Sequence, residues 1–273
     1  MSDARTNTID ASFMAEVLAA VRAVADTEVM PRYRKVGHER KADGTLLTEA
    51  DIASQAALVS RLTAIEPYPV VGEEMTPDQQ RNAWDKGDAG LWCVDPIDGT
   101  SNFVHGVPQF AVSVALMRAR RPILGVIHAP VLGETFSAAA GRGAAVNGQP
   151  LASSGGAPDL SGALANVDFK RLPRDLGTLL AAAPPYLSQR NLGSATLEWC
   201  YLAAGRLDIY LHGGQQLWDY AAGSLILAEA GGALGTLDCD DFWADAPWRR
   251  SVLAARDPAL YASWRDWVRR HRR

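Results

Sequence analysis

The sequence has few cysteines, no excess of basic residues and no apolar run of transmembrane length. Its three cysteines, Cys93, Cys200 and Cys239, form no Cys-x-x-Cys pair and cannot all pair with one another. A reducing compartment is therefore favoured over a disulfide framework. The N-terminus carries acidic residues and a helical pattern in place of a signal peptide. We expect a cytoplasmic protein that does not associate with membranes.

The charge balance is slightly acidic, with 27 basic and 31 acidic side chains and a formal net charge of −4 over 273 residues. This balance argues against a broad surface for binding nucleic acid. The remaining composition, 48% apolar and 21% charged, is that of an ordinary globular protein. A chain of this length can bury a large core, as one domain or as two closely packed halves.

Apolar periodicity predicts two helices followed by a sheet. Residues Phe13 to Val24 have helical spacing and stop before Pro31. A turn at Asp43-Gly44 precedes a second helix in "KADGTLLTEADIASQAALVSRL". Short strand-like runs come next: "PVVG", "LWCV", "FAVSVALM", "PILGVIHAP" and "ETFSAAA". Their spacing predicts a largely antiparallel sheet behind the two helices.

The segment "LASSGGAPDLSG" (151–162) has the most linker-like composition in the chain. We therefore expect an N-terminal α+β half over residues 1–150 and a C-terminal α/β half over residues 151–273. In the second half, helical and strand patterns alternate. The last of the long patterns, "WDYAAGSLILAEAGG", predicts a helix that ends at Gly231-Gly232.

Acidic residues recur where apolar segments end. Glu73 follows one apolar run, Asp95 and Asp98 follow another, and Asp219 begins a helical pattern. A scaffold can direct side chains at such positions into one cleft, where converging carboxylates repel one another unless cations bind. Oxygen ligands without cysteine or histidine suit Mg²⁺ better than zinc.

A phosphate position adjoins these acids. Gly99 and Thr100 offer backbone N–H groups at an expected helix start, a place that attracts phosphate. Acids that bind metal beside such a position suggest metal-assisted phosphoryl hydrolysis. Two structural alternatives remain open: Asp219 can cap its own helix, and Thr48-x-x-Asp51 fits a capping box.

Four segments together carry a family resemblance: "GEE", "WCVDPIDGTSNFVHG", "NLGSATLEWCYLAAGRLD" and "LWDYAAGSLILAEAGG". In order and spacing the chain resembles the inositol monophosphatase family of Mg²⁺-dependent, typically lithium-sensitive phosphatases. The likeness covers nearly the whole length. It implies an α+β fold, the layered α-β-α-β-α sandwich of the inositol monophosphatase and fructose-1,6-bisphosphatase type, and a homodimer.

The resemblance also implies roles for single residues and for two or three Mg²⁺ ions. Asp95 would bridge two ions, with Glu73 on the first and Asp98 and Asp219 on the second. Thr100, hydrogen-bonded to Asp51, resembles the pair that orients and activates the attacking water. The implied catalytic residues are Asp51, Thr100 and Glu73. The implied metal ligands are Glu73, Asp95, the carbonyl of Ile97, Asp98 and Asp219.

The implied substrate contacts include one departure from the family. They are Ile97, Asp98, Gly99, Thr100, Gly193, Ser194, Ala195, His212 and Asp219. His212 stands seven residues before Asp219, where inositol-specific members usually carry a glutamate that accepts hydrogen bonds from a ring hydroxyl. Histidine has a shorter reach and can donate a hydrogen bond.

A small phosphate ester is the expected partner. An inositol 1-phosphate type of sugar or polyol phosphate is favoured, and histidinol phosphate, fructose 1,6-bisphosphate and 3′-phosphoadenosine 5′-phosphate are the alternatives. A non-catalytic regulatory protein that binds RNA or transcription machinery is a rival from another class. Its signature would be an eroded acid set or a basic face, and the sequence has neither.

Overall fold

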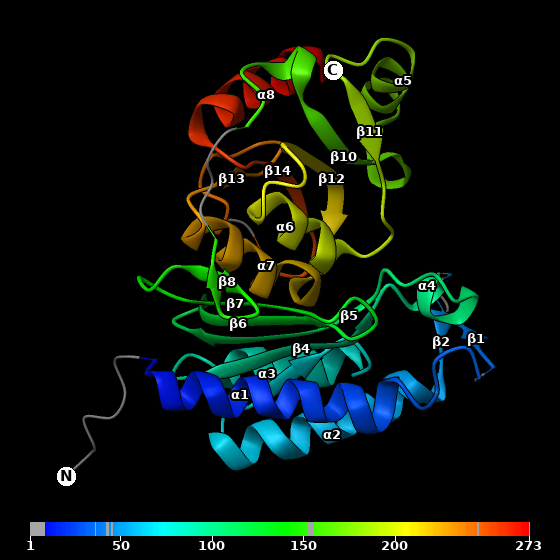
Figure 1. The fold of residues 1–273 in the computed structure, drawn as a ribbon, viewed down its shortest axis with the longest axis vertical. Helices are drawn as coiled ribbons and strands as arrows, with labels where there is room; N and C mark the ends of the chain where they lie inside the picture. The colour runs from blue at the N-terminus through cyan, green and yellow to red at the C-terminus, as the bar shows by residue number, and fades with distance from the viewer. Residues whose placement is uncertain are drawn as a thin grey trace.

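The structure, a computed structural model, describes residues 9–35, 37–41, 44, 46–151, 156–244 and 246–272. Figure 1 shows five layers stacked along the longest axis: helices, a sheet, helices, a second sheet and further helices. This arrangement confirms the expected α+β layered sandwich.

The first layer contains α1 (Ala11–Val24) and α2 (Glu49–Ile65). Asp10 caps α1 by accepting a hydrogen bond from the backbone N–H of Phe13, and the helix continues into a π-helical turn, Ala25–Val29. The buried faces of both helices pack on one side of the first sheet, as the apolar periodicity predicted. A short antiparallel pair, β1 (Glu39–Arg40) and β2 (Leu46–Leu47), joins them. Of the turn predicted between these strands, Gly44 has the left-handed conformation, and Asp43 lies outside the described residues.

The first sheet has seven strands in the order β3-β4-β5-β6-β7-β8-β9. Only β3 and β4 are parallel, so the sheet is largely antiparallel, as predicted. The strands are β3 (Val70–Gly72), β4 (Leu91–Asp98), β5 (Ala111–Arg118), β6 (Arg121–Ala129), β7 (Glu134–Ala139), β8 (Ala144–Val146) and β9 (Gln149–Pro150). Helix α3 (Pro77–Lys86) packs beside β3, and the short α4 (Thr100–His105) follows β4.

The middle layer consists of α6 (Ala195–Ala203) and α7 (Leu217–Glu229). Both are buried on most sides, since they pack against each other, against the first sheet and against Tyr210 and Val252 of the second sheet. Helix α7 ends as predicted, with Gly231 in the left-handed conformation.

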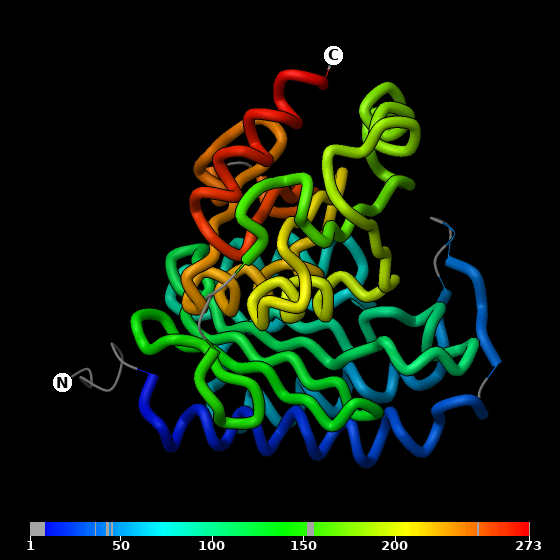
Figure 2. Tube along the Cα trace, turned by 45° about the horizontal axis from the view of Figure 1, so that its top comes forward, coloured from blue at the N-terminus to red at the C-terminus, as the bar shows by residue number. Residues whose placement is uncertain are grey.

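The second sheet has five strands in the order β11-β10-β12-β14-β13. Its strands are β10 (Leu164–Asp168), β11 (Ser188–Arg190), β12 (Ile209–Gln215), β13 (Ala233–Gly235) and β14 (Arg250–Ala255). Helices α5 (Arg174–Ala182) and α8 (Pro258–His271) form the outer layer. The tube in Figure 2 follows the same order of layers from the N-terminal to the C-terminal elements.

The two sheets lie on either side of the expected boundary in the sequence. β9 ends at Pro150 and β10 begins at Leu164, while residues 152–155 of the linker lie outside the described residues. Helices α6 and α7 nevertheless share one continuous core with the first sheet. The division into functional halves therefore stays a prediction. Among the described helices, none has the length and hydropathy required to cross a membrane.

Candidate metal centre and active site

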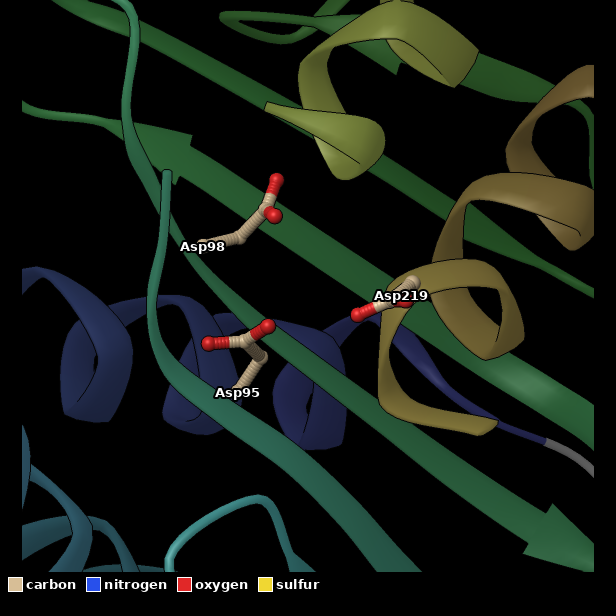
Figure 3. A group of neighbouring side chains, drawn as sticks. All are labelled: Asp95, Asp98 and Asp219. Atoms are coloured by element: carbon tan, nitrogen blue, oxygen red, sulfur yellow. The ribbon is translucent and has the colours of Figure 1, made fainter. Parts of the chain in front are cut away.

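Three aspartates converge where the first sheet meets α7. Asp95 and Asp98 lie in the last four residues of β4, and Asp219 lies in the first turn of α7. One carboxylate oxygen of each residue lies within 4.8 Å of those of the other two. Figure 3 shows the three side chains extending into a common space between β4 and α7.

A bulge in β4 makes this convergence possible. Residues three apart in a regular strand point to opposite faces. Here Asp95 pairs with Ser113 and Asp98 pairs with Ala111, so β4 contains one more residue than β5 over this interval. Because of this extra residue, the side chains of both aspartates point to the same face of the sheet. β-Bulges often redirect side chains in this way next to active sites.

Asp98 is held in place by three donors from the start of α6. Its Oδ2 accepts hydrogen bonds from Ser194 Oγ at 2.6 Å, Thr196 N at 2.7 Å and Thr196 Oγ1 at 2.7 Å. Burial raises the pKa of Asp98, although these donors oppose the shift. These three donors all bind Oδ2 and fix the carboxylate of Asp98 beside Asp95 and Asp219.

The charges of the cluster are poorly compensated without a cation. Burial, followed by the charges of Glu73 and Asp98, raises the pKa of Asp95 well above its ordinary value. Burial and the charge of Asp98 likewise raise the pKa of Asp219, which also caps α7 by accepting from the N–H of Gln216 at 2.8 Å. A divalent cation would remove this repulsion. The all-oxygen donor set fits Mg²⁺.

Glu73 lies beside the cluster and pairs with a lysine that the sequence patterns did not reveal. Lys41 Nζ is 2.9 Å from Glu73 Oε1 and 2.6 Å from Glu74 Oε1. Burial, opposed by Lys41, raises the pKa of Glu73 to about 7. Lys41 lies 32 residues before Glu73, and a single lysine in a polar segment gives no signal of such a contact.

Thr100 and Asp51 meet near the cluster, since the charge of Asp51 acts on both Asp95 and Glu73. Thr100 Oγ1 lies 3.1 Å from the carbonyl oxygen of Ile97 and 3.5 Å from Asp51 Oδ1. The predicted capping box is confirmed, since Thr48 N and Thr48 Oγ1 donate to Asp51 Oδ2 at 2.7 and 2.6 Å. This box leaves Asp51 Oδ1 facing Thr100. Burial raises the pKa of Asp51 against the opposing effect of Thr48.

Gly99 allows α4 to begin directly after the bulge. Its φ is +88°, and a Cβ at this position would lie 2.9 Å from the carbonyl oxygen of Gln109. A side chain is therefore disfavoured both by backbone conformation and by space. The expected helix start at Thr100 is confirmed.

The loop before α6 is held by a buried glutamate. Glu198 accepts hydrogen bonds from the N–H groups of Leu192 and Gly193 at 2.9 and 3.2 Å and from Tyr210 OH at 2.8 Å. Burial raises the pKa of Glu198 to about 7. The segment Gly193–Ala195 is thereby fixed beside Asp98, through the hydroxyl of Ser194.

A family comparison agrees with this geometry. The family model described as "Inositol monophosphatase family" matches residues 10–269. The chain belongs to the inositol monophosphatase family.

The relatives in this family carry two kinds of name. The chain is 35% identical over 209 residues to inositol monophosphatase 2 of Solanum lycopersicum, covering 73% of this chain and 78% of the relative. It is 38% identical over 194 residues to Nus factor SuhB of Pseudomonas aeruginosa, covering 68% and 70%. The structure of the Thermotoga maritima IMPase superposes with a TM-score of 0.82 at 28% identity, covering 95% and 97% of the two chains. The chain is therefore an inositol monophosphatase family phosphatase.

His212, which the family resemblance implies as a substrate contact, lies on β12 seven residues before Asp219. Its Nε2 is 3.1 Å from Asp168 Oδ2, and its Nδ1 accepts a hydrogen bond from the N–H of Gly214 at 3.0 Å. The ring is buried, with 6% of the residue exposed. Asp168 is a second residue that the sequence patterns did not reveal, because only the parallel pairing of β10 with β12 places it opposite His212.

Proposed function

We propose that this chain is a Mg²⁺-dependent phosphomonoesterase that hydrolyses a small sugar or polyol phosphate of the inositol 1-phosphate type. The convergence of Asp95, Asp98 and Asp219 within 4.8 Å carries this proposal. Membership of a phosphatase family supports the reaction class. The Thr100–Asp51 contact beside the cluster supports hydrolysis by a directed water.

The metal ligands proposed are Glu73, Asp95, the carbonyl of Ile97, Asp98 and Asp219, which together would hold two or three Mg²⁺ ions. Bound Mg²⁺ would make a water nucleophilic near neutral pH and offset the negative charge of the phosphate. The raised pKa values of Asp95 and Asp219 support this assignment, since burial and then the charges of neighbouring carboxylates raise both, and a cation at the cluster would offset them.

Other groups of the protein orient the attacking water and bind the phosphate. Thr100 and Asp51 orient the attacking water, and Glu73 is the third catalytic residue, through the metal ion that it would hold. The N–H groups of Gly99 and Thr100 bind phosphate oxygens at the start of α4, where the helix dipole favours negative charge. Because the nucleophile is water, which attacks phosphorus in line with the departing alkoxide, the P–O bond to the leaving group breaks without formation of a phosphoenzyme. Holding these groups rigidly acts mainly on the transition state.

The substrate side is formed by Gly193, Ser194 and Ala195 in this proposal, together with Ile97, Asp98, Gly99, Thr100 and Asp219, and the buried ring of His212 lines it without offering a free ring nitrogen. Histidinol phosphate, fructose 1,6-bisphosphate and 3′-phosphoadenosine 5′-phosphate are the alternative esters. We also propose a cytoplasmic, lithium-sensitive homodimer, as the family resemblance implies.

A regulatory role is the second candidate, favoured by similarity to a protein named Nus factor SuhB. Retention of the acid cluster and of the Thr100–Asp51 contact supports catalysis in addition to any such role.

A phosphate-release screen tests the proposal. The purified chain is given myo-inositol 1-phosphate, fructose 1,6-bisphosphate, histidinol phosphate and 3′-phosphoadenosine 5′-phosphate, each with Mg²⁺ or with EDTA. We expect release only with Mg²⁺ and the highest kcat/KM for a sugar or polyol ester. Absence of release from every ester would overturn the phosphatase assignment, and a preference for the nucleotide would overturn the substrate class.

A further inference from the structure

The ring nitrogens of His212 are both engaged within the protein. Because Nδ1 accepts the N–H of Gly214, the ring proton lies on Nε2 and is donated to Asp168 Oδ2, 3.1 Å away. A buried imidazole in this arrangement has no ring nitrogen left for a substrate. The hydroxyl acceptor that the family glutamate would supply must come from another side chain.

Asp168 has the free acceptor capacity that His212 lacks. Its Oδ1 accepts from the N–H of Lys170 at 2.8 Å, and its Oδ2 faces His212. Within the described part of the chain these two donors use about half of the acceptor positions of a carboxylate. The side chain of Asp168 is 18% exposed, whereas that of His212 is 8% exposed.

The strand register places Asp168 on the face that leads to the metal cluster. Asp168 lies directly opposite His212 in the parallel β10–β12 pair, so their side chains share a face. Tyr210, two residues before His212, is on that face too and donates to Glu198 of α6. Because α6 begins with the donors that hold Asp98, this face points toward the candidate site.

The turn after Asp168 fixes this geometry. The 3₁₀ turn Phe169–Arg171 lies so close to β12 that a Cβ on Gly213 would stand 1.7 Å from the carbonyl oxygen of Arg171. The charge of Arg171, the last residue of this turn, acts on both Asp168 and Asp219, so the turn lies within electrostatic range of both carboxylates. The pairing of β12 with β14 shifts register between His212 and Gln215, the interval that contains Gly213.

We propose that Asp168 is the specificity-determining acceptor for a hydroxyl of the leaving group, and that His212 is the positioning residue that orients it. This inference rests on the proposed function. The family resemblance implies a glutamate at the His212 position of β12. In this chain the acceptor carboxylate would instead be that of Asp168 on the neighbouring strand β10. Arg171 at the same edge disfavours an ammonium-bearing leaving group, because a second cation would be repelled, and so favours a polyol hydroxyl.

The test compares two esters across matched variants. The readout is the ratio of kcat/KM for myo-inositol 1-phosphate to kcat/KM for phenyl phosphate, whose leaving group has no further hydroxyl. Asp168→Asn should lower this ratio about 10-fold to 100-fold, chiefly through KM, because a hydrogen bond to a charged acceptor is lost. Asp175→Asn, on the exposed first turn of α5, is the matched control and should leave the ratio within about twofold.

A second pair of variants tests the positioning role of His212. His212→Gln retains a donor toward Asp168 and should keep the ratio within about threefold. His212→Phe retains ring shape without a donor and should lower the ratio about as much as Asp168→Asn. Thermal unfolding of each variant separates this effect from a loss of folding.

The possible outcomes are distinct. An active wild type whose ratio is unchanged in Asp168→Asn overturns the inference, as does a ratio that falls in His212→Phe alone. Preference for ethanolamine phosphate, lost in Asp168→Asn, would overturn the choice of a hydroxyl over an ammonium. A wild type without Mg²⁺-dependent release from either ester overturns the proposed function and this inference with it.

Discussion

Thr100 has one hydroxyl proton and two acceptors within reach. The Ile97 carbonyl lies at 3.1 Å and Asp51 Oδ1 at 3.5 Å, so the proton can be directed to either while an incoming water binds the hydroxyl oxygen. Catalytic contacts of this kind are often long before substrate binds. We expect Thr100→Ala to lower kcat about 100-fold or more, with little change in the Mg²⁺ concentration at half-maximal rate.

Thr100→Ser is the control for this prediction, because it retains the hydroxyl and should restore most of kcat. Steady-state kinetics over a range of Mg²⁺ concentrations provide the measurement. If Thr100→Ala lost about 1 kcal/mol of stability and kept its kcat, the role of Thr100 would be limited to stabilising the start of α4.

The site residues differ in how far the sequence could predict them. Asp95, Asp98, Thr100 and Asp51 lie within motifs whose spacing is local and specific, and the structure brings the first two together with Asp219. The donors that hold Asp98 could not be predicted, since Ser194 lies 96 residues away from it. Lys41 and Asp168 were missed for the same reason: their partners become neighbours only through strand pairing and loop placement.

At the scale of elements, α2 and α3 begin with the same kind of capping box. Thr48 and Asp51 form it in α2, and Thr76 and Gln79 form it in α3. Only the first box contains a residue of the candidate site. We expect Thr48→Ala to cost about 1 kcal/mol of stability and also to lower kcat about 10-fold, because Asp51 loses the hydroxyl donor that helps to orient it.

Thr76→Ala is the matched control. It removes an exposed cap of the same type and should cost a similar free energy of unfolding without changing kcat. Chemical denaturation and steady-state kinetics on both variants decide the matter. Equal kinetic effects in the two variants would mean that the loss of kcat in Thr48→Ala reports general destabilisation.

The bulge in β4 shows why element prediction is incomplete. The apolar run "LWCV" identified the strand, but the strand continues through Asp98, and the extra residue opposite β5 is visible only in the paired register. A period-two pattern alone would have placed Asp95 and Asp98 on opposite faces. Short strands such as β9 also carry too few residues to show any periodicity.

For the whole molecule, the acid cluster links stability, and with it the proposed metal binding, to pH. The pKa of Glu73 is raised to about 7, and those of Asp95 and Asp219 are raised well above their ordinary values. A carboxyl whose pKa is higher in the folded state than in the unfolded state binds its proton more tightly when folded. Its contribution to stability is therefore full at low pH and is lost as pH rises through the folded pKa.

If Mg²⁺ binds these carboxylates as proposed, it should reverse this loss, because a metal ion binds the ionised form and replaces the protons. We expect the rise in Tm on adding saturating Mg²⁺, relative to EDTA, to grow as pH increases from about 5 to 7.5. Differential scanning fluorimetry across that pH range measures it.

Glu198 supplies the control for the pH prediction. Its pKa is also raised to about 7 by burial, but it binds the loop before α6 and is outside the cluster. Glu198→Gln should therefore retain the pH-dependent growth of the Mg²⁺ effect. A Mg²⁺ shift that is independent of pH in the wild type would contradict metal binding at these carboxylates.

The measurement that tests the central claim most directly is phosphate release as a function of Mg²⁺ by the wild type and by Asp98→Asn. The amide oxygen of the variant can still accept from Ser194 and Thr196, so we expect the fold to be retained. The amide nitrogen replaces the other carboxylate oxygen and removes one negative charge from the cluster. We expect Mg²⁺-dependent release by the wild type and by the exposed control Asp175→Asn, and a loss of about 100-fold or more in Asp98→Asn at saturating Mg²⁺. Near-wild-type kcat in folded Asp98→Asn would contradict the assignment of these aspartates as the catalytic metal centre.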